Sequence, residues 1–174
     1  MKLRKNYKLY NFWRYVLGIQ KEDRVKINDF SFKIGSWIYY KSKEYNSKIK
    51  NCGKWMLFFS RENYMFAKEI CMEAAINNIV YTCKHTSFET DSLQKFSLTG
   101  VICFYLDGLS ENQHKKVISF LKDKDLIRKT KTGKYFNISF KFDIQTLSGD
   151  YGKDFTPEIK LSDFVNLDTH EFIK

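Results

Sequence analysis

The chain has 174 residues, 43% hydrophobic and 29% charged, with 30 aromatic residues and a single proline. This composition is that of one globular domain and excludes a disordered chain or a long proline-rich linker. The net charge of +10 favours an acidic or polyanionic partner without identifying it. The longest apolar run, 101–106, is far too short for a spanning helix, and the first twenty residues lack the apolar core of a secretory signal. We therefore expect a cytoplasmic protein.

Charge is distributed unevenly along the chain. Residues 1–54 carry 14 lysines and arginines against 4 acidic residues, whereas residues 55–174 carry 16 of each. Within the second part, 115–141 holds 9 basic and 2 acidic residues, and 142–174 holds 3 basic and 7 acidic residues. We expect a basic N-terminal extension at 1–54 packing on a domain at 55–174, a second basic surface and an acidic tail. Charge runs of this kind also occur on ordinary solvated faces, which is the alternative.

An amphipathic helix is predicted near the start of the chain, with Gly18 placed to end it. Its apolar residues recur at i, i+3, i+4, i+7 and i+8 and are Leu9, Phe12, Trp13, Val16 and Leu17. We expect this helix to pack on the domain, with attachment to a membrane surface as the alternative. Apolar and polar residues then alternate over 30–34, which predicts a half-buried strand running toward 37–40, followed by a loop at 41–51.

The elements from residue 55 to residue 144 follow a strand, helix, strand, strand, helix, strand order. They are a strand at 55–59, a helix at about 61–77 capped by Ser60, strands at 79–85 and 101–106, a helix at about 110–123 with a capping box of Ser110 and Gln113, and a two-faced strand at about 135–144. This split-βαβ order predicts an α+β fold with both helices on one face of an antiparallel sheet. The N-terminal strand would extend that sheet, and one more short element is expected within 159–167.

The cysteines and histidines show no metal or cofactor signature. The four cysteines are too widely spaced for a redox pair or a zinc ribbon and are expected to be buried reduced thiols; they are Cys52, Cys71, Cys83 and Cys103. The three histidines are scattered, and neither a glycine-rich phosphate loop nor a nucleophile elbow is present. We therefore expect neither a metal nor a cofactor.

The order of elements is shared with RNA-recognition modules, whose central strands present aromatic rings to stacked bases. The glycine- and aromatic-rich signature of those modules is absent from 100–107, and Phe104 is expected in the core. Trp55, Phe59 and Tyr105 are candidates for a stacking platform, with covered packing as the alternative. Only five of the 30 basic residues are arginine, which favours following a phosphate backbone over reading base edges.

The segment 81–87 brings a lysine, a histidine and hydroxyl groups together at the end of a predicted strand. Alternation places Lys84 and His85 on opposite faces, so acid–base catalysis by both requires a bulge or a turn. The alternative is an exposed lysine beside a structural histidine. Lys141 and Asp143 are expected on the polar face of the last strand, where Lys141 could join Lys84 across the sheet to hold a phosphate group. The alternative is a cross-strand lysine–aspartate pairing on the surface.

Four short motifs between about residues 53 and 152 resemble those of the basophilic-leukaemia-expressed-protein family. They are Gly-Lys-Trp-Met-Leu-Phe-Phe from Gly53, Cys-Lys-His-Thr-Ser from Cys83, Val-Ile-Cys-Phe-Tyr-Leu-Asp from Val101 and Phe-Lys-Phe-Asp-Ile-Gln-Thr from Phe140. The resemblance implies a fold like that of the cap-binding translation initiation factor 4E, a curved antiparallel sheet backed by helices. The family-like positions are Lys84, Lys141, Asp143 and Thr146.

Some bacterial members of that family are labelled phosphothreonine lyases, so the resemblance also implies an enzyme alternative. A lyase of this type needs a lysine base to remove the α-proton and a histidine acid to protonate the leaving phosphate. In this chain Lys84 or Lys141 would be the base and His85 the acid. A third alternative is a module without catalysis that docks an acidic protein partner through the N-terminal helix.

The leading hypothesis is a protein that binds RNA or a ribonucleoprotein without catalysis. One such role is that of a phage-encoded anti-CRISPR protein, which inhibits a nucleic-acid-guided defence complex. Phosphate contacts are expected from the basic N-terminal segment, from Lys84 and Lys141 with Asp143 and Thr146 beside them, and from the 115–141 surface. The residues of that surface are Lys115, Lys116, Arg128, Lys129, Lys131 and Lys134.

Overall fold

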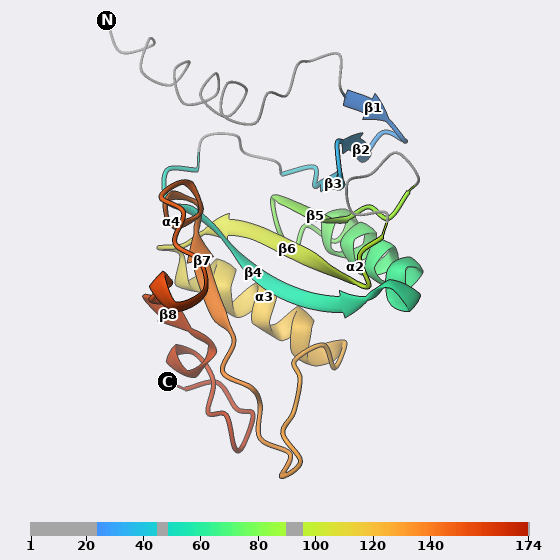
Figure 1. Ribbon diagram of the computed structural model, residues 1–174. Helices are drawn as coiled ribbons and strands as arrows, with labels where there is room; N and C mark the ends of the chain where they lie inside the picture. The colour runs from blue at the N-terminus through green and yellow to red at the C-terminus, as the bar shows by residue number, and fades with distance from the viewer. Residues whose placement is uncertain (1–23, 45–48, 90–95, 174) are drawn as a thin grey trace, which may run out of the picture.

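The computed structural model describes residues 24–44, 49–89 and 96–173, and the predicted helix at 9–17 lies outside these ranges. The chain forms an α+β fold, as predicted, around one antiparallel sheet (Figure 1). The strands formed by the described residues number eight and lie in the order β1-β2-β3-β5-β6-β4-β7-β8. Within the described ranges, no helix combines the length and the apolar character needed to cross a membrane.

The elements have the following bounds. The strands are β1 (Arg24–Lys26), β2 (Ser31–Ile34), β3 (Trp37–Lys41), β4 (Cys52–Ser60), β5 (Thr82–Thr86), β6 (Thr99–Asp107), β7 (Ser139–Phe142) and β8 (Ile159–Lys160). The helices are α2 (Tyr64–Ile76), α3 (Glu111–Asp123) and α4 (Asp143–Leu147), with 3-10 turns η2 (Arg61–Asn63), η3 (Gly152–Asp154) and η4 (Leu161–Asp163). The charge boundary at residue 54 therefore falls inside β4.

Helices α2 and α3 cover the same face of the sheet (Figure 1). The alternate residues Ile102, Phe104 and Leu106 of β6 are buried in one cluster with Ile70 of α2 and Ile118 of α3. Burying a side chain of this size stabilises the fold by about 1.5–3 kcal/mol. The residues between them point to the other side of the sheet, which we call the far face. The sheet is therefore two-sided, with the main core on the helix side.

The predicted strand at 30–34 does not continue to 37–40 as one strand. It turns back at Gly35, whose φ of +52° is in the left-handed region that favours glycine, so that β2 and β3 form a hairpin with Ile34 opposite Trp37. β3 then pairs antiparallel with β5. The prediction that the N-terminal part of the chain extends the sheet is confirmed.

The predicted strand at 135–144 is correct only over its middle. β7 covers Ser139–Phe142, Phe136 is exposed outside it, and the chain becomes helical at Asp143. The side-chain carboxamide of Gln145 accepts a hydrogen bond from the backbone N–H of Phe142 at 3.0 Å, which supports this change of direction. The prediction that Lys141 and Asp143 share the polar face of one strand is therefore wrong, because β7 ends before Asp143.

The predicted caps are correct in position only, because Ser110 and Ser60 stand at the N-caps of α3 and η2 without a capping side-chain hydrogen bond. The side chain of Ser110 makes no capping hydrogen bond, and Gln113 instead accepts from the backbone N–H of Asp107 and donates to the hydroxyl of Tyr81. Ser60 precedes the 3-10 turn η2 and its hydroxyl accepts from the Asn63 side chain. Gln113 thus ties α3 to β6 and to the segment before β5.

Gly53 of β4 stands opposite Phe142 of β7, where the two strands pack tightly. A Cβ atom at this position would overlap the ring of Phe140 and lie 2.9 Å from the backbone oxygen of Lys141. We expect Gly53→Ala to destabilise the protein by about 1–3 kcal/mol, because either strand must move to relieve the overlap. Urea unfolding followed by tryptophan fluorescence measures this change. An unchanged unfolding midpoint would contradict the close approach of the two strands.

Candidate functional site

Lysines and aromatic rings from four adjacent strands meet on the far face. In one row of the sheet Tyr39 of β3 stands opposite Lys84 of β5, and Lys84 stands opposite Cys103 of β6. In the next row Tyr105 of β6 stands opposite Lys54 of β4. Residues directly opposite one another in an antiparallel pair place their side chains on the same face. We call this set, with Trp37, Lys141, Asp143 and Thr146 at its margin, the lysine–aromatic face.

Lys84 is the centre of this face. Its ammonium group lies 3.9 Å from the ring centre of Trp37, 5.3 Å from that of Tyr39 and 5.6 Å from that of Tyr105. The rings attract the charged ammonium, while burial of the side chain lowers the pKa of Lys84. In the described part of the chain, no hydrogen bond or ion pair to this ammonium is found.

Lys54 lies beside Lys84 across the ring of Tyr105, whose centre is 5.6 Å from each ammonium group. It is only 6% exposed and donates to the carboxylate of Asp143 at 2.6 Å and to the hydroxyl of Thr146 at 2.7 Å. The first turns of α4 bring both acceptors to one side. Sequence reasoning missed Lys54, although its position directly before the core residue Trp55 places it on the far face by alternation.

Lys141 is near Lys54 but does not join Lys84. It stands opposite Lys54 in the sheet, so β6 and β4 separate it from β5. Its ammonium donates to the backbone carbonyl of Asp150 and lies 3.6 Å from the ring centre of Tyr151. The structure therefore brings together Lys84, Lys54, Asp143 and Thr146, and it places Lys141 at the margin.

His85 lies on the opposite face from Lys84. It is fully buried on the helix side, where the hydroxyl of Tyr40 lies 3.1 Å from Nε2 and the backbone oxygen of Thr86 lies 2.9 Å from Nδ1. A carbonyl can only accept, so Nδ1 carries the proton and Nε2 accepts from Tyr40. The pairing of β5 with both neighbouring strands continues through this position without a bulge. Lys84 and His85 are therefore not placed to act on one substrate.

The predicted stacking platform has a different composition. Trp55 is fully buried on the helix side, where its indole N–H donates to Nδ1 of His114 at 3.1 Å. Phe59 also packs against the main core. Only Tyr105 of the predicted three lies on the far face, where Trp37 and Tyr39 accompany it.

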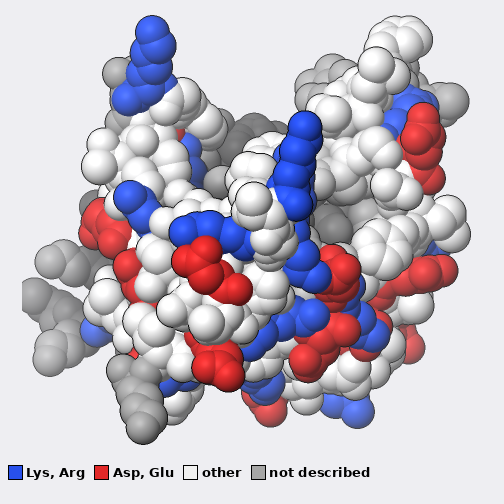
Figure 2. Space-filling view, turned by 90° about the horizontal axis from the view of Figure 1, so that it is seen from below, with Lys and Arg blue, Asp and Glu red and all other residues white. Residues whose placement is uncertain are grey.

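The predicted basic surface at 115–141 carries many ion pairs. Lys115 pairs with Glu111 and Lys129 with Asp125, each at 2.6 Å. Seen from below, basic and acidic side chains interleave on the molecular surface (Figure 2). Arg128 packs over the ring of Phe136 at 5.2 Å. Much of the local positive charge on this surface is therefore balanced.

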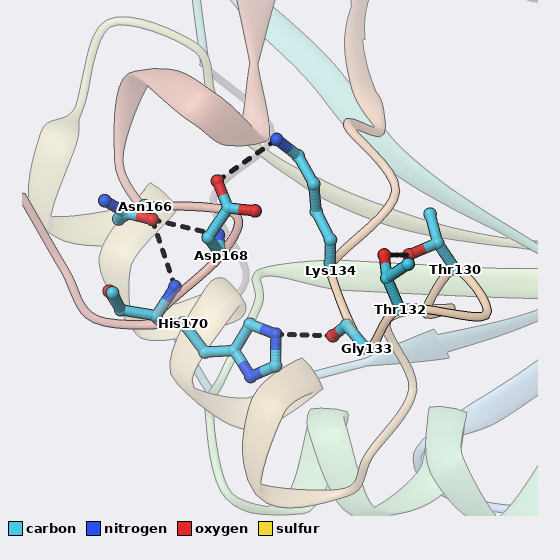
Figure 3. A network of polar contacts seen from close by, with 8 residues as sticks. Thr130, Thr132, Gly133, Lys134, Asn166, Asp168 and His170 are labelled. Atoms are coloured by element: carbon cyan, nitrogen blue, oxygen red, sulfur yellow. Dashed lines mark hydrogen bonds and ion pairs between the residues drawn. The ribbon is translucent and has the colours of Figure 1, made fainter.

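The acidic tail folds back on the turn at the end of this surface (Figure 3). Lys134 pairs with Asp168 at 3.1 Å, and Nε2 of His170 contacts the backbone oxygen of Gly133 at 2.9 Å. His170 also stacks on Tyr135 with ring centres 3.8 Å apart. Lys116 and Lys131 are exposed and complete the predicted set. The tail thus neutralises part of the turn that carries Lys134.

The lysine–aromatic face presents the ammonium groups of Lys54 and Lys84 beside aromatic rings. No group of three or more histidine, cysteine or acidic side chains is placed to hold a metal ion in the ranges that the structure covers. Models of known protein families give no match to this chain, and a comparison with curated proteins gives none either. The function proposed below therefore depends on the geometry of the lysine–aromatic face.

Proposed function

We propose that the protein binds RNA, free or within a ribonucleoprotein, through the lysine–aromatic face and without catalysis. The observation that carries this proposal is Lys84, an ammonium group without an acidic partner among the described residues, held between Trp37, Tyr39 and Tyr105. A cation beside flat rings is suited to a nucleotide, because the cation attracts the phosphate and the rings accept a stacked base.

The remaining lysines support the same proposal. Lys54 has its charge balanced by Asp143, so it adds a hydrogen-bond donor more than a net charge. Exposed lysines such as Lys116 and Lys131, together with the charge excess of 1–54, provide the longer-range attraction that brings a polyanion to the surface. The predominance of lysine over arginine favours recognition of the charged RNA backbone rather than of the base sequence.

Four further ideas have less support. The lyase alternative rests on the resemblance to the basophilic-leukaemia-expressed-protein family alone, since Lys84 and His85 face opposite ways. The initiation factor 4E-like fold is likewise proposed from that resemblance. The role as an inhibitor of a nucleic-acid-guided defence complex is a setting in which a ribonucleoprotein binder would act, and it rests on composition. Docking of an acidic protein partner involves residues outside the described ranges.

We expect a fluorescently labelled single-stranded RNA to bind with an affinity that falls steeply as salt rises. Lys84→Met should weaken binding about tenfold or more and reduce the logarithmic salt slope by about one, because one phosphate contact is lost. Fluorescence anisotropy over a salt series measures both quantities.

The matched control is Lys122→Met on α3. Lys122 also holds its ammonium over an aromatic ring, that of Phe172 at 4.5 Å, but it lies away from the far face. Its replacement should leave affinity within about twofold, the range of an indirect charge effect. Equal losses from the two variants, or no binding at low salt, would overturn the proposal.

A further inference from the structure

Two polar groups of β5 have no hydrogen-bond partner in the described structure. The hydroxyl of Thr82 is buried without a partner, and the ammonium of Lys84 contacts only aromatic rings. Thr82 and Lys84 are two residues apart in one strand, so both side chains lie on the far face. A buried hydroxyl without a partner is costly, and each such group in a folded protein requires an explanation. A bound acceptor with several oxygens would satisfy both donors.

The surroundings of these donors are dry and aromatic. Burial raises the pKa of Tyr39 to about 12 and that of Tyr105 well above its usual value. Tyr105 stands opposite Thr82 in the sheet, and Tyr39 stands opposite Lys84. On the other side of these two residues, Lys41 of β3 stands opposite Thr82 and Cys103 of β6 stands opposite Lys84. The ammonium of Lys84 therefore lies among aromatic rings, and the hydroxyl of Thr82 lies between Tyr105 and Lys41. A ligand group that reaches them must be compact and must protrude from the rest of its molecule.

A terminal phosphate meets this requirement better than an internal one. An internal phosphodiester has a sugar on each side and one negative charge, whereas a phosphomonoester is attached by a single bond and carries about −1.5 to −2 charges at pH 7. It also offers three strong acceptor oxygens. The ammonium and the hydroxyl can each donate to a different one, and the larger charge matches a lysine that forms no ion pair with any described acidic residue.

We propose that the lysine–aromatic face recognises the phosphomonoester at the end of an RNA chain. Lys84 and Thr82 donate to its oxygens, and the terminal nucleoside lies against Trp37. This inference rests on the proposed RNA binding and adds its ligand class, a terminal phosphomonoester. The same chemistry is present in a free nucleoside monophosphate, so the two sources are separated by experiment.

The test compares RNA oligonucleotides of one sequence that end in a 5′-phosphate, a 3′-phosphate or hydroxyl groups, together with uridine monophosphate and uridine. Binding is measured by isothermal titration calorimetry with the full chain. We expect RNA with a phosphate at one of its two ends to bind at least about tenfold more tightly than RNA with hydroxyl ends, because the phosphate accepts charge-assisted hydrogen bonds. Uridine monophosphate alone should bind more weakly than that RNA, because it lacks the remaining backbone contacts.

Thr82→Val removes the hydroxyl but keeps the β-branched shape that suits a strand. It should reduce the preference for the phosphorylated end about tenfold while leaving binding of hydroxyl-ended RNA unchanged. Lys84→Met should abolish the preference. The matched control is Thr99→Val, which removes the hydroxyl of an exposed threonine in β6. This variant should keep the preference for the phosphorylated end unchanged. Thermal melting of each variant confirms that it is folded.

The outcomes separate the two proposals. Equal binding of phosphorylated and hydroxyl-ended RNA, or no effect of Thr82→Val, overturns the terminal-phosphate inference and leaves RNA binding standing. A third outcome is that uridine monophosphate binds, Thr82→Val weakens this binding, and no RNA binds. The ligand would then be a free nucleotide, and the proposed function would be overturned. Absence of binding to every ligand overturns both.

Discussion

Replacing Asp143 with alanine is expected to destabilise the protein by about 3–5 kcal/mol, the largest single effect that the structure implies. The Lys54 side chain is only 8% exposed and that of Asp143 14%, and their charged atoms are 2.6 Å apart. Without the carboxylate, the Lys54 ammonium keeps the hydroxyl of Thr146 and the ring of Tyr105 but stays buried as an unbalanced charge. The free energy of unfolding in urea measures the loss.

Two controls identify the cause of that loss. Combining Asp143→Ala with Lys54→Met removes both charges, and the double variant should recover a large part of the lost stability. Glu111→Ala breaks the exposed pair with Lys115, and we expect little change in stability. A double variant no more stable than Asp143→Ala would show that the carboxylate acts through the start of α4 and not through Lys54.

The second large effect is a loss of stability in mild acid. Burial lowers the pKa of His85 and of His114, and in each the hydrogen bonds hold the neutral ring. Nδ1 of His114 accepts from Trp55, so Nε2 carries the proton toward the backbone oxygen of Gly108 at 3.0 Å. A proton on the accepting nitrogen would displace the Trp55 N–H from its acceptor. Protonation therefore favours the unfolded chain.

The pH window follows from the sign of these shifts. In the unfolded chain the two histidines become protonated near pH 6.5, whereas in the folded protein they stay neutral to a lower pH. The stabilisation is complete above about pH 6.5 and falls below it by as much as about 1.4 kcal/mol per pH unit for each histidine. Urea unfolding at intervals from pH 7.5 to pH 5.5 measures the slope. His114→Gln should reduce that slope by about half, and a flat profile of the original protein would contradict both assignments.

Alternation along single strands is the part of the structure that can be predicted from the sequence. The apolar run at 101–106 is the centre of β6, and Phe104 lies in the core as predicted. The same period of two correctly places Lys84 and His85 on opposite faces. These inferences depend on residues close together in the chain, whose relation a strand fixes through its geometry alone.

Contacts between distant segments could not be predicted in this way. The acceptor of Lys54 is Asp143, 89 residues away, and it is reached because β4 is between β6 and β7 in the sheet. Asp168 of the tail reaches Lys134 across 34 residues. Gly35 was available as a turn signal, but the alternation on both sides of it also fits a single strand. The strand order, which brings Asp143 to Lys54, leaves no local pattern in the sequence.

The central place of β4 in the sheet also determines how the chain can assemble during its synthesis. β4 ends at Ser60, but its partners β6 and β7 begin at Thr99 and Ser139. Pairing between segments so far apart closes long loops and slows folding. Until those partners emerge, an apolar strand edge is open to association with other chains. The strand that holds Lys54 and Trp55 is therefore the segment most exposed to aggregation while the nascent chain is incomplete.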